Sequence, residues 1–380
     1  MSPFWQLPEP ARYLRAIVED LRAGSNVVLA VPDHTPDGRV AALSAALSTA
    51  NLPNVQEIQP NGSTPVAAIH ELLTLGPCPP KATVMDLCDN EGFRRRLLHL
   101  QPFTSASWPT WSNFLLQYED ACRQLPLPDR TLFVVELCGE LAANAPDQAN
   151  LLRVHPWLAR MDGLNTRLLA AEQLGAGNIQ IPWQRQLAVA TLAELALWDP
   201  EVVATGASLT LDQILEPEPW LAQIGAARGW TPNDDLRSPA SRWRGLRQPF
   251  EERPRTHSAW LALASRSEAL SQRLWTAQVA SLFPFLERHR RGLIHCYRKM
   301  FKLPWTTTFG PINAAEDLEL GHIADQLRLT SGRLRDTARF VRWLRDIRNE
   351  LAHLKPAPAA LLLDSQFQSR METFLPSADD

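Results

Sequence analysis

The chain has 380 residues, of which 45% are hydrophobic and 21% are charged, and its formal net charge at pH 7 is −3. This composition is typical of a globular protein with two or three domains, and it excludes an intrinsically disordered chain. The longest apolar runs have the length of a strand and are too short to span a membrane, and the first ten residues show no secretory signal. We therefore expect a cytoplasmic protein that does not bind membranes.

Five cysteines are present, and no two of them form a Cys-x-x-Cys pair. An odd number without such a pair favours free thiols in a reducing cytoplasm over a disulfide framework or a zinc site. We expect no metal site and no cofactor.

The first 180 residues alternate between helical and strand-like patterns. An amphipathic helix is predicted over residues 10–22, and the apolar run 26–32 predicts a buried strand. The elements expected after them are a helix at 38–50, a strand at 55–59, a helix at 64–75, a strand at 82–88, a helix at 111–125, and strands at 131–137 and 151–154. Strands joined by crossover helices predict a mainly parallel sheet that is covered on both faces.

From residue 161 onward the pattern is helical. Helices are expected at 161–174, 182–198, 209–226, 259–293 with an extension toward 301, 316–329, 333–354 and 365–374. Residues 229–254 are rich in Pro, Asn, Asp, Gly and Arg, which predicts a linker or domain boundary. We therefore expect a multi-domain fold, α/β followed by all-α, with a mainly parallel α/β domain at 1–180, a helical middle and linker at 181–254, and a helical domain at 255–380.

The loop after the first strand occupies the place of a nucleotide-binding loop in a P-loop domain. An active loop has two glycines that bracket four residues, followed by lysine and by serine or threonine, because backbone amides, an ammonium group and a hydroxyl together bind phosphate and magnesium. Here only Gly38 fits this pattern, since Arg39 replaces the lysine and Val40 carries no hydroxyl. Asp33 and Asp37 would also repel phosphate.

A second acidic group lies at the end of the strand expected at 82–88. Asp86 would end this strand and Asp89 and Glu91 follow it, which gives the outline of a magnesium-binding strand end. Residues 1–180 thus resemble a degenerate P-loop domain of the STAND or AAA kind. The resemblance implies a sensor domain that does not hydrolyse nucleotides. Nucleotide binding without hydrolysis and an unrelated α/β domain remain open as alternatives.

The helix expected at 333–354 carries the most informative pattern in the chain. An apolar stripe at helical period is formed by Phe340, Leu344, Ile347, Leu351 and Leu354. Asn349 and His353 are i, i+4 neighbours on nearly the opposite face. Arg342 and Arg345 lie close to them on the helical projection, and Arg348 lies on the flank. Because a proline three residues later prevents a further turn, His353 is expected in the last turn of the helix.

Arg348, Asn349 and His353 form an Arg-Asn-x-x-x-His motif near the end of this helix. The motif and its helical setting resemble the HEPN superfamily. The resemblance implies a helical bundle that cleaves RNA without a metal, usually across a dimer interface, with these three residues as the catalytic set. The alternative is that Arg348 forms a local ion pair and that His353 caps the helix end, where the helix dipole favours a positive side chain.

The net charge conceals an asymmetry along the chain. Residues 255–355 contain 17 Lys and Arg against 9 Asp and Glu, so this segment carries +8 and the remainder carries −11. A basic segment favours a polyanionic partner such as RNA, with arginines that merely solvate helix surfaces as an equally open alternative. The side chains expected to contact RNA are Arg288, Arg291, Arg342 and Arg345. Three acidic residues stand at the start of the helix expected at 316–329, namely Glu316, Asp317 and Glu319. We interpret them as charges that complement the helix N-terminus, with pairing to Arg348 as the alternative.

The two resemblances together imply a cytoplasmic ribonuclease effector whose N-terminal half senses a trigger. Families that combine STAND-like and HEPN-like parts are associated with prokaryotic conflict and antiviral defence. The expected partners are RNA, other proteins of a defence system, and a second copy of the chain bound through the C-terminal domain. The alternative function is a catalytically inactive scaffold or adaptor that binds RNA or other subunits of a defence complex.

Overall fold

The computed structural model describes residues 3–60, 63–146, 151–175, 179–308, 310–330 and 334–368. The chain divides into two units, which we call the sheet unit and the helical unit. The sheet unit comprises Met1–Leu169, Leu197–Pro200 and Asn233–His257. The helical unit comprises Ala170–Ala196, Glu201–Pro232 and Ser258–Asp380. Within the described ranges, no helix has both the length and the apolar character needed to cross a membrane.

The sheet unit is built on five parallel strands in the order β2-β3-β4-β1-β5. The strands are β1 (Asn26–Val31), β2 (Val55–Ile58), β3 (Leu97–Leu100), β4 (Leu132–Cys138) and β5 (Leu152–Pro156). In the centre of the sheet, Val28 is in register with Val135 on one side and with Val154 on the other. The predicted parallel sheet is thus confirmed, and its continuous apolar strands are typical of a sheet buried on both faces.

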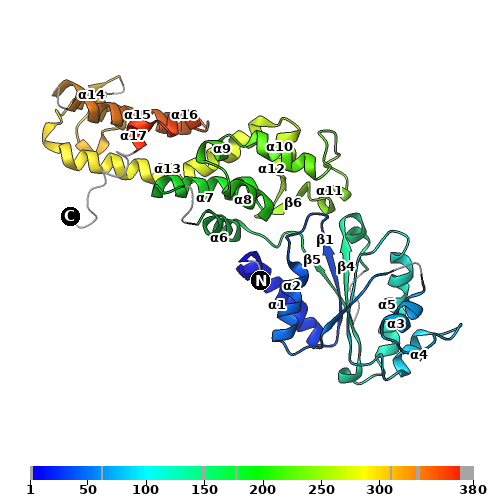
Figure 1. Ribbon diagram of the computed structural model, residues 1–380. Coiled ribbons are helices and arrows are strands. Elements are labelled where there is room, and N and C mark those ends of the chain that lie inside the picture. The colour runs from blue at the N-terminus through cyan, green and yellow to red at the C-terminus, as the bar shows by residue number, and fades with distance from the viewer. Residues whose placement is uncertain are drawn as a thin grey trace. The chain divides into compact units, whose positions relative to one another are not determined.

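Helices cover both faces of this sheet (Figure 1). They are α1 (Pro8–Arg22), α2 (Arg39–Thr49), α3 (Pro65–Leu72), α4 (Val84–Asp89) and α5 (Trp108–Cys122). Helices α1 and α2 lie on one face, and α3, α4 and α5 lie on the other. On the second face, Trp111, Tyr118 and Phe133 are fully buried and belong to one apolar cluster. Aromatic side chains of this size contribute much of the burial that stabilises a core.

The strand expected at 82–88 is wrong, because this segment forms helix α4. Thr83 and Asp86 form a capping box, in which the Asp86 carboxylate accepts the backbone N–H of Thr83 at 2.7 Å and the Thr83 hydroxyl accepts the backbone N–H of Asp86 at 3.3 Å. This exchange satisfies two amides that a helix start would otherwise leave unpaired. The hydrogen bonds that the Thr83 backbone N–H and the Thr83 hydroxyl donate to the Asp86 carboxylate, at 2.7 and 2.8 Å, lower the pKa of Asp86. The expected magnesium-binding strand end is wrong for the same reason.

Residues 229–254 were expected to be a linker or domain boundary, and a boundary between the two units does fall in this segment, between Pro232 and Asn233. A linker is wrong for most of its second half, which forms helix and strand in the sheet unit. This part of the chain contains α11 (Ala240–Trp243) and a hairpin of β6 (Arg247–Phe250) and β7 (Arg253–Thr256). The turn residues Glu251 and Glu252 both have positive φ. Such a turn normally has Asn-Gly or Asp-Gly, so two glutamates gave no hairpin signal in the sequence.

The helical unit contains the remaining helices. They are α7 (Pro182–Ala196), α8 (Pro200–Ala207), α9 (Leu211–Leu215), α10 (Glu218–Ala227), α12 (Ser258–Leu263), α13 (Ser267–Tyr297), α14 (Leu320–Thr330), α15 (Arg335–Ala352), α16 (Ala359–Leu362) and α17 (Ser365–Gln368). Helix α6 (Gly163–Leu174) follows β5 in the sequence, and the division between the two units falls within it. A short hairpin of β8 (Trp305–Thr307) and β9 (Gly310–Ile312) precedes α14.

Three helix pairs dominate the packing of the helical unit: α7 with α13, α10 with α12, and α14 with α15. Helix α13 has 31 residues and also contacts α14 and α15 (Figure 1). The helix expected at 209–226 is divided into α9 and α10, because Pro217 stands between them. Part of the short helix expected at 365–374 is α17, and residues 369–374 lie outside the described residues.

Candidate functional site

Helix α15 is strongly amphipathic, and the structure buries the side that the sequence predicts. Phe340, Leu344, Ile347 and Leu351 are each at most 1% exposed. The ring of Phe340 lies 6.1 Å from the ring of His289, which is itself fully buried in α13. The apolar side of α15 therefore faces α13 and α14.

Leu354 was expected to end the apolar stripe, but it is 71% exposed. Helix α15 ends at Ala352, and Leu354 follows with a φ of +60°. The N–H of Leu354 donates to the Leu351 carbonyl, and the N–H of Lys355 donates to the Glu350 carbonyl at 3.1 Å. These two hydrogen bonds are those of a Schellman motif, which normally has glycine at the left-handed position. The left-handed residue turns the chain out of the helical path and takes Leu354 away from the stripe.

His353 is the C-cap residue of α15, and it is exposed. Its backbone N–H donates to the carbonyls of Asn349 and Glu350, at 3.0 and 3.1 Å. Within the described part of the chain, its imidazole makes no hydrogen bond or ion pair. The backbone at this histidine is therefore held in place while the imidazole can contact solvent or another molecule.

Two side chains of α13 hold the end of α15, and sequence reasoning assigned neither of them a role at the site. Trp275 donates its indole N–H to the Leu351 carbonyl at 2.8 Å. Gln278, which is buried, exchanges two hydrogen bonds with the backbone of Ala357, at 3.1 and 2.7 Å. These contacts fix the segment before and after His353. A single tryptophan and a single glutamine within a helix form no motif, so only the tertiary structure could identify them.

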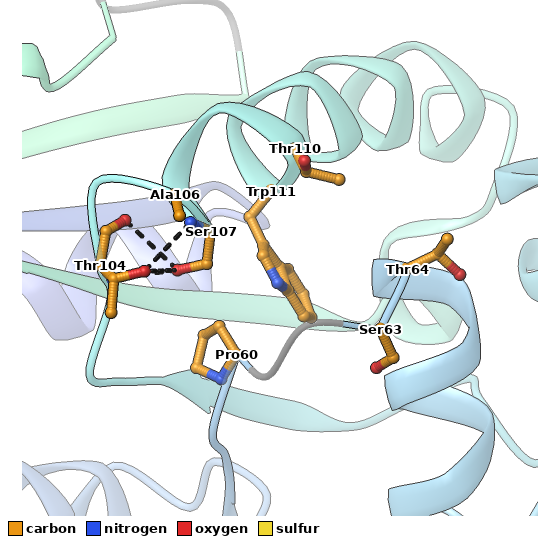
Figure 2. A pocket seen from close by; sticks show the side chains of 8 residues that line it. All are labelled: Pro60, Ser63, Thr64, Thr104, Ala106, Ser107, Thr110 and Trp111. Carbon is orange, nitrogen blue, oxygen red and sulfur yellow. Dashed lines mark hydrogen bonds between the residues drawn. The ribbon is translucent and has the colours of Figure 1, made fainter.

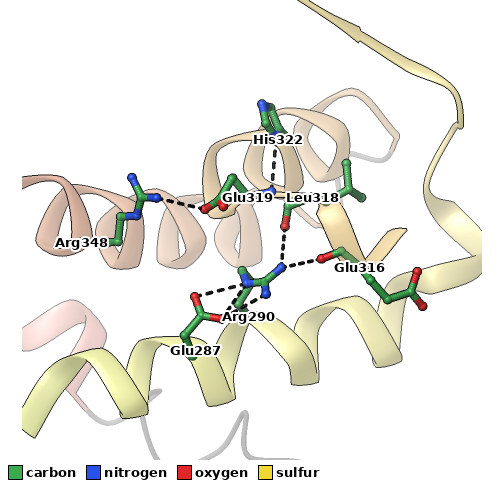
Figure 3. Close-up of polar contacts among 7 residues, drawn as sticks. All are labelled: Glu287, Arg290, Glu316, Leu318, Glu319, His322 and Arg348. Carbon is green, nitrogen blue, oxygen red and sulfur yellow. Dashed lines mark hydrogen bonds and ion pairs between the residues drawn. The ribbon is translucent and has the colours of Figure 1, made fainter. Parts of the chain in front are cut away.

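Arg348 forms an ion pair with Glu319, the residue that precedes α14 (Figure 3). The guanidinium nitrogen and the carboxylate oxygen are 3.4 Å apart, and the two side chains are 40% and 53% exposed. An exposed pair at this distance contributes little to stability. The backbone N–H of Glu319 also donates to Nδ1 of His322, which caps the start of α14.

The other two acidic residues of this segment do not pair with Arg348. Glu316 pairs with Arg298, and its backbone carbonyl accepts a hydrogen bond from Arg290 at 2.8 Å. Arg290 also reaches the Leu318 carbonyl, as Figure 3 shows, so α13 fixes the segment that carries Glu319. Among the three acidic residues, Glu319 is thus the partner of Arg348, the role that the sequence left as an alternative.

The remaining polar residues expected on α15 lie on its accessible side. Arg345 pairs with its neighbour Asp346 at 2.7 Å. Arg342 and Asn349 are half-buried, and within the described residues their side chains make no hydrogen bond or ion pair. Arg348 and His353 are five residues apart, which separates them by about 140° around the helix axis. One helix therefore brings Asn349 and His353 to the same face but leaves Arg348 on another.

Arg288 and Arg291 are exposed on α13, and neither has an ion-pair partner within the described ranges. They stand one turn apart on the side away from the buried Leu286 and Leu293. His289 between them faces the interior, and its Nδ1 lies 2.9 Å from the Phe285 carbonyl oxygen. The two arginines therefore form a small basic surface on one face of this helix.

The loop of the sheet unit that resembles a nucleotide-binding loop has its basic residue engaged internally. Arg39, at the start of α2, donates to both carboxylate oxygens of Glu136 in β4 and to the Thr35 hydroxyl. Its side chain is 12% exposed, and that of Glu136 is 5% exposed. The Asp33 carboxylate lies against Gly139, where a Cβ would clash with it, and burial raises the pKa of Asp33. The loop therefore presents no free cation to a phosphate group.

No protein-family model matches the chain, and no curated protein or solved structure matches it. Across the described ranges, no three His, Cys, Asp or Glu side chains are grouped as metal ligands would be.

Proposed function

We propose that this chain is a HEPN-like endoribonuclease that acts without a metal ion, and that its cleavage site lies at the C-terminal end of α15. The observation that carries this proposal is the exposed imidazole of His353, held at a fixed helix end beside Asn349 and within two turns of Arg345 and Arg348. In this proposal the sheet unit senses a trigger and does not hydrolyse nucleotides. The biological setting is defence of a prokaryotic cell against invading genetic elements.

The reaction suited to these side chains is internal transfer at an RNA phosphate. The 2′-oxygen attacks the adjacent phosphorus, the bond from phosphorus to the 5′-oxygen breaks, and a 2′,3′-cyclic phosphate and a 5′-hydroxyl result. His353 accepts the proton of the 2′-hydroxyl, because an imidazole exchanges protons near neutral pH. Arg348 stabilises the charge that develops on the phosphate oxygens. Asn349 orients the imidazole or the phosphate.

A second protomer would complete this chemistry. One α15 supplies one histidine, whereas the transfer needs one group that accepts a proton and one that gives a proton to the leaving 5′-oxygen. A two-fold dimer formed through the helical unit would place two such helix ends around one cleft. Arg348 would then exchange Glu319 for the RNA phosphate, which the weak exposed pair permits. Arg288, Arg291 and Arg342 would bind the RNA backbone.

The topology of the sheet unit supports the proposed resemblance to P-loop domains. Read from β5, the strand order is β5-β1-β4-β3-β2, which is the order found in P-loop domains of the AAA and STAND kind. The internal pairing of Arg39 with Glu136 supports the absence of nucleotide hydrolysis. A sheet unit of this kind would act through binding alone.

A second candidate function is an inactive scaffold or adaptor that binds RNA or other subunits of a defence complex. The observation that favours it is the state of two arginines on which phosphate chemistry would depend. Arg39 is paired with Glu136, and Arg348 is paired with Glu319. A protein that used neither arginine on a phosphate could keep both pairs permanently.

Cleavage of RNA by the purified full chain in EDTA distinguishes the two functions. Total tRNA and a mixed single-stranded RNA are the substrates, and the variants are His353→Ala and Arg348→Ala. We expect each variant to lose at least about a hundredfold in rate, the usual contribution of a general acid–base group for His353 and of a charge-stabilising donor for Arg348. The control is Arg339→Ala, which removes another exposed arginine of α15 that is paired with Asp336. It should cleave as the wild type does.

The chemical ends of the products and the behaviour of the variants in cells complete this test. Cyclic phosphate ends on the products would agree with the proposed transfer, whereas 3′-hydroxyl ends would contradict it. If the wild type and His353→Ala are equally inactive in vitro, and equally competent in cells that express the neighbouring defence proteins, the scaffold is the correct function. Circular dichroism of each variant checks that the fold is retained.

A further inference from the structure

The second half of α13 and the segment after it carry a row of cations. Residues 288–302 contain six Lys and Arg and no Asp or Glu. Two of the six are engaged, because Arg290 pairs with Glu287 at 3.0 Å and Arg298 pairs with Glu316. The other four are exposed and make no ion pair within the described part of the chain. We call these four residues the stripe: Arg288, Arg291, Lys299 and Lys302.

Helical geometry aligns most of the stripe on one face of α13. Arg291 follows Arg288 by three residues, the exposed His295 comes four residues later, and Lys299 four residues after that, in the turn Arg298–Met300. At about 100° per residue these positions stay within roughly 80° of one another. The row from Arg288 to Lys299 is therefore roughly 15–20 Å long and has no acidic side chain in it.

The stripe lies on the side of α13 away from α15. The ring of His289, which is buried, lies 6.1 Å from that of Phe340 and marks the side of α13 that packs on α15. Trp275 contacts the last turn of α15, and from Trp275 to Arg288 the helix rises about 20 Å. The stripe is thus a surface separate from the one that carries His353.

Fold stability does not explain this row. Like charges three or four residues apart on a helix repel each other, whereas a helix surface that only meets solvent normally mixes both signs. The helix dipole favours cations only in the last turn. Arg288 and Arg291 precede the end of α13 at Tyr297 by more than one turn. A polyanion that neutralises the row would relieve its repulsion.

Two other places that could be considered for a phosphate group offer it no unpaired cation. Arg39 is held by Glu136. The pocket of about 460 Å³ in the sheet unit (Figure 2) has no Lys or Arg among the described residues that line it. Two of its hydroxyls, those of Thr104 and Ser107, hydrogen-bond to each other at 3.1 Å. Charge complementarity therefore favours the stripe.

Two exposed apolar side chains adjoin the lysines of the stripe in the sequence. Met300 is 43% exposed and Leu303 is 38% exposed. An unpaired RNA strand presents the faces of its bases to a protein, whereas a duplex keeps them stacked inside, so apolar side chains beside cations suit a single strand. Two side chains that are each less than half exposed are too small an apolar surface to insert into a membrane.

We propose that the stripe binds the phosphate backbone of single-stranded RNA, as an anchoring surface outside the cleavage site. This inference rests on the proposed function in taking RNA as the partner, and it adds Lys299 and Lys302 to the two arginines expected from the sequence. An RNA that contacts both the stripe and His353 must extend at least about 20 Å along the helical unit. The substrate class is therefore long unpaired RNA.

Filter binding of poly(U) to the full chain tests the proposal, with His353→Ala as the parent so that the RNA stays intact. The stripe variant adds four substitutions: Arg288→Gln, Arg291→Gln, Lys299→Gln and Lys302→Gln. At low ionic strength the dissociation constant should rise at least about tenfold. The slope of its logarithm against the logarithm of salt concentration should become shallower by about three, because each cation on a single strand contributes about 0.7.

A matched control separates the position of the charges from their number. It removes four exposed cations of the sheet unit from the same parent, by Arg15→Gln, Lys81→Gln, Arg167→Gln and Arg253→Gln. This control should bind poly(U) as the parent does. Equal loss in both variants, or unchanged binding in the stripe variant, would contradict the proposal. Circular dichroism checks the fold, and Arg291→Gln alone, which should reduce the slope by about 0.7, replaces the stripe variant if that does not fold.

Other probes separate the proposed partner from other anionic surfaces. Vesicles that contain phosphatidylserine should not bind through the stripe, and a stripe that binds them but not poly(U) would overturn the proposal. Met300→Ser/Leu303→Ser should weaken binding of poly(U) and leave that of a duplex RNA unchanged, whereas equal effects on both would contradict single-strand recognition. Binding is measured without cleavage, so failure of the stripe and failure of the proposed ribonuclease are distinguishable.

Discussion

Leu354 occupies a backbone conformation that its side chain disfavours. Its φ is +60° and its side chain is 71% exposed, so little burial compensates the unfavourable geometry. For an L-residue the left-handed conformation costs roughly 1–2 kcal/mol, whereas glycine adopts it freely. We expect Leu354→Gly to raise the free energy of unfolding by about 1 kcal/mol, after allowance for the greater freedom of glycine in the unfolded chain.

Urea denaturation of the full chain measures this change. The control is Leu354→Ala, which shortens the side chain but keeps the Cβ, so its unfolding midpoint should stay near that of the wild type. A destabilised Leu354→Gly variant would mean that the exposed side chain makes contacts that its accessibility hides. Strain that persists beside His353 fits a site where local geometry serves a purpose other than stability.

For single residues, the sequence predicted which side chains face the core. It did not predict which polar side chains pair with one another. The positions of Phe340, Leu344 and Ile347 follow from helical period alone. The partner of Arg348 does not, since Glu319 is 29 residues away and two other acidic side chains stand close to it in the sequence. The roles of Arg348, Asn349 and His353 in cleavage stay predictions.

At the scale of elements, the ion pair between α15 and the start of α14 engages Arg348, the side chain that we propose contacts the RNA phosphate. Glu319→Gln removes the negative charge and leaves a side chain of nearly the same shape. Because the pair is exposed, the free energy of unfolding should change by less than about 1 kcal/mol. The freed guanidinium should bind RNA more tightly, and cleavage should become faster at subsaturating RNA.

Filter binding and cleavage rates at low ionic strength check this expectation. The matched control is Glu316→Gln, which releases Arg298 instead of Arg348. Equal gains in both variants would show that overall charge is the cause, and no gain in either would show that Arg348 does not contact RNA.

Elements were predicted best where one pattern dominated. The strands β1 and β4 are continuous apolar runs bounded by turn residues, and both were placed within one or two residues of their observed ends. The segment 82–88 was misassigned because its apolar content suits a buried strand, whereas the capping box formed by Thr83 and Asp86 starts a helix there. The β6–β7 hairpin was missed because its turn lacks glycine.

At the scale of the whole molecule, buried histidines make stability depend on pH. His99 in β3 is 1% exposed, and its Nε2 lies 3.8 Å from a carboxylate oxygen of Glu136 without a hydrogen bond. His155 in β5 is also buried, and its Nε2 lies 2.8 Å from a carboxylate oxygen of Asp20. Burial lowers the pKa of both side chains below the ordinary value of 6.5.

The lowered pKa values of His99 and His155 determine how the stability of the fold changes with pH. The unfolded chain binds protons at these histidines more readily than the folded chain does, so the free energy of unfolding is highest above pH 6.5 and falls as the pH drops below it. We expect the urea midpoint of the wild type to decrease between pH 7.5 and pH 5.5. His99→Leu should show a smaller decrease, while His295→Leu, which replaces an exposed histidine of α13, should match the wild type. Identical pH profiles for His99→Leu and the wild type would refute this account.

The discontinuity of the two units has a consequence for how the protein is made. The last segment of the sheet unit is Asn233–His257, so a growing chain on the ribosome cannot complete that unit until these residues have emerged. By then Ala170–Ala196 and Glu201–Pro232 are already outside, without α13, against which α7 packs. Helix α7 can already contact α9, but the surface with which it packs against α13 stays uncovered for that interval, because α13 is synthesised afterwards. Helix α7 is therefore the segment that we expect a chaperone to meet first.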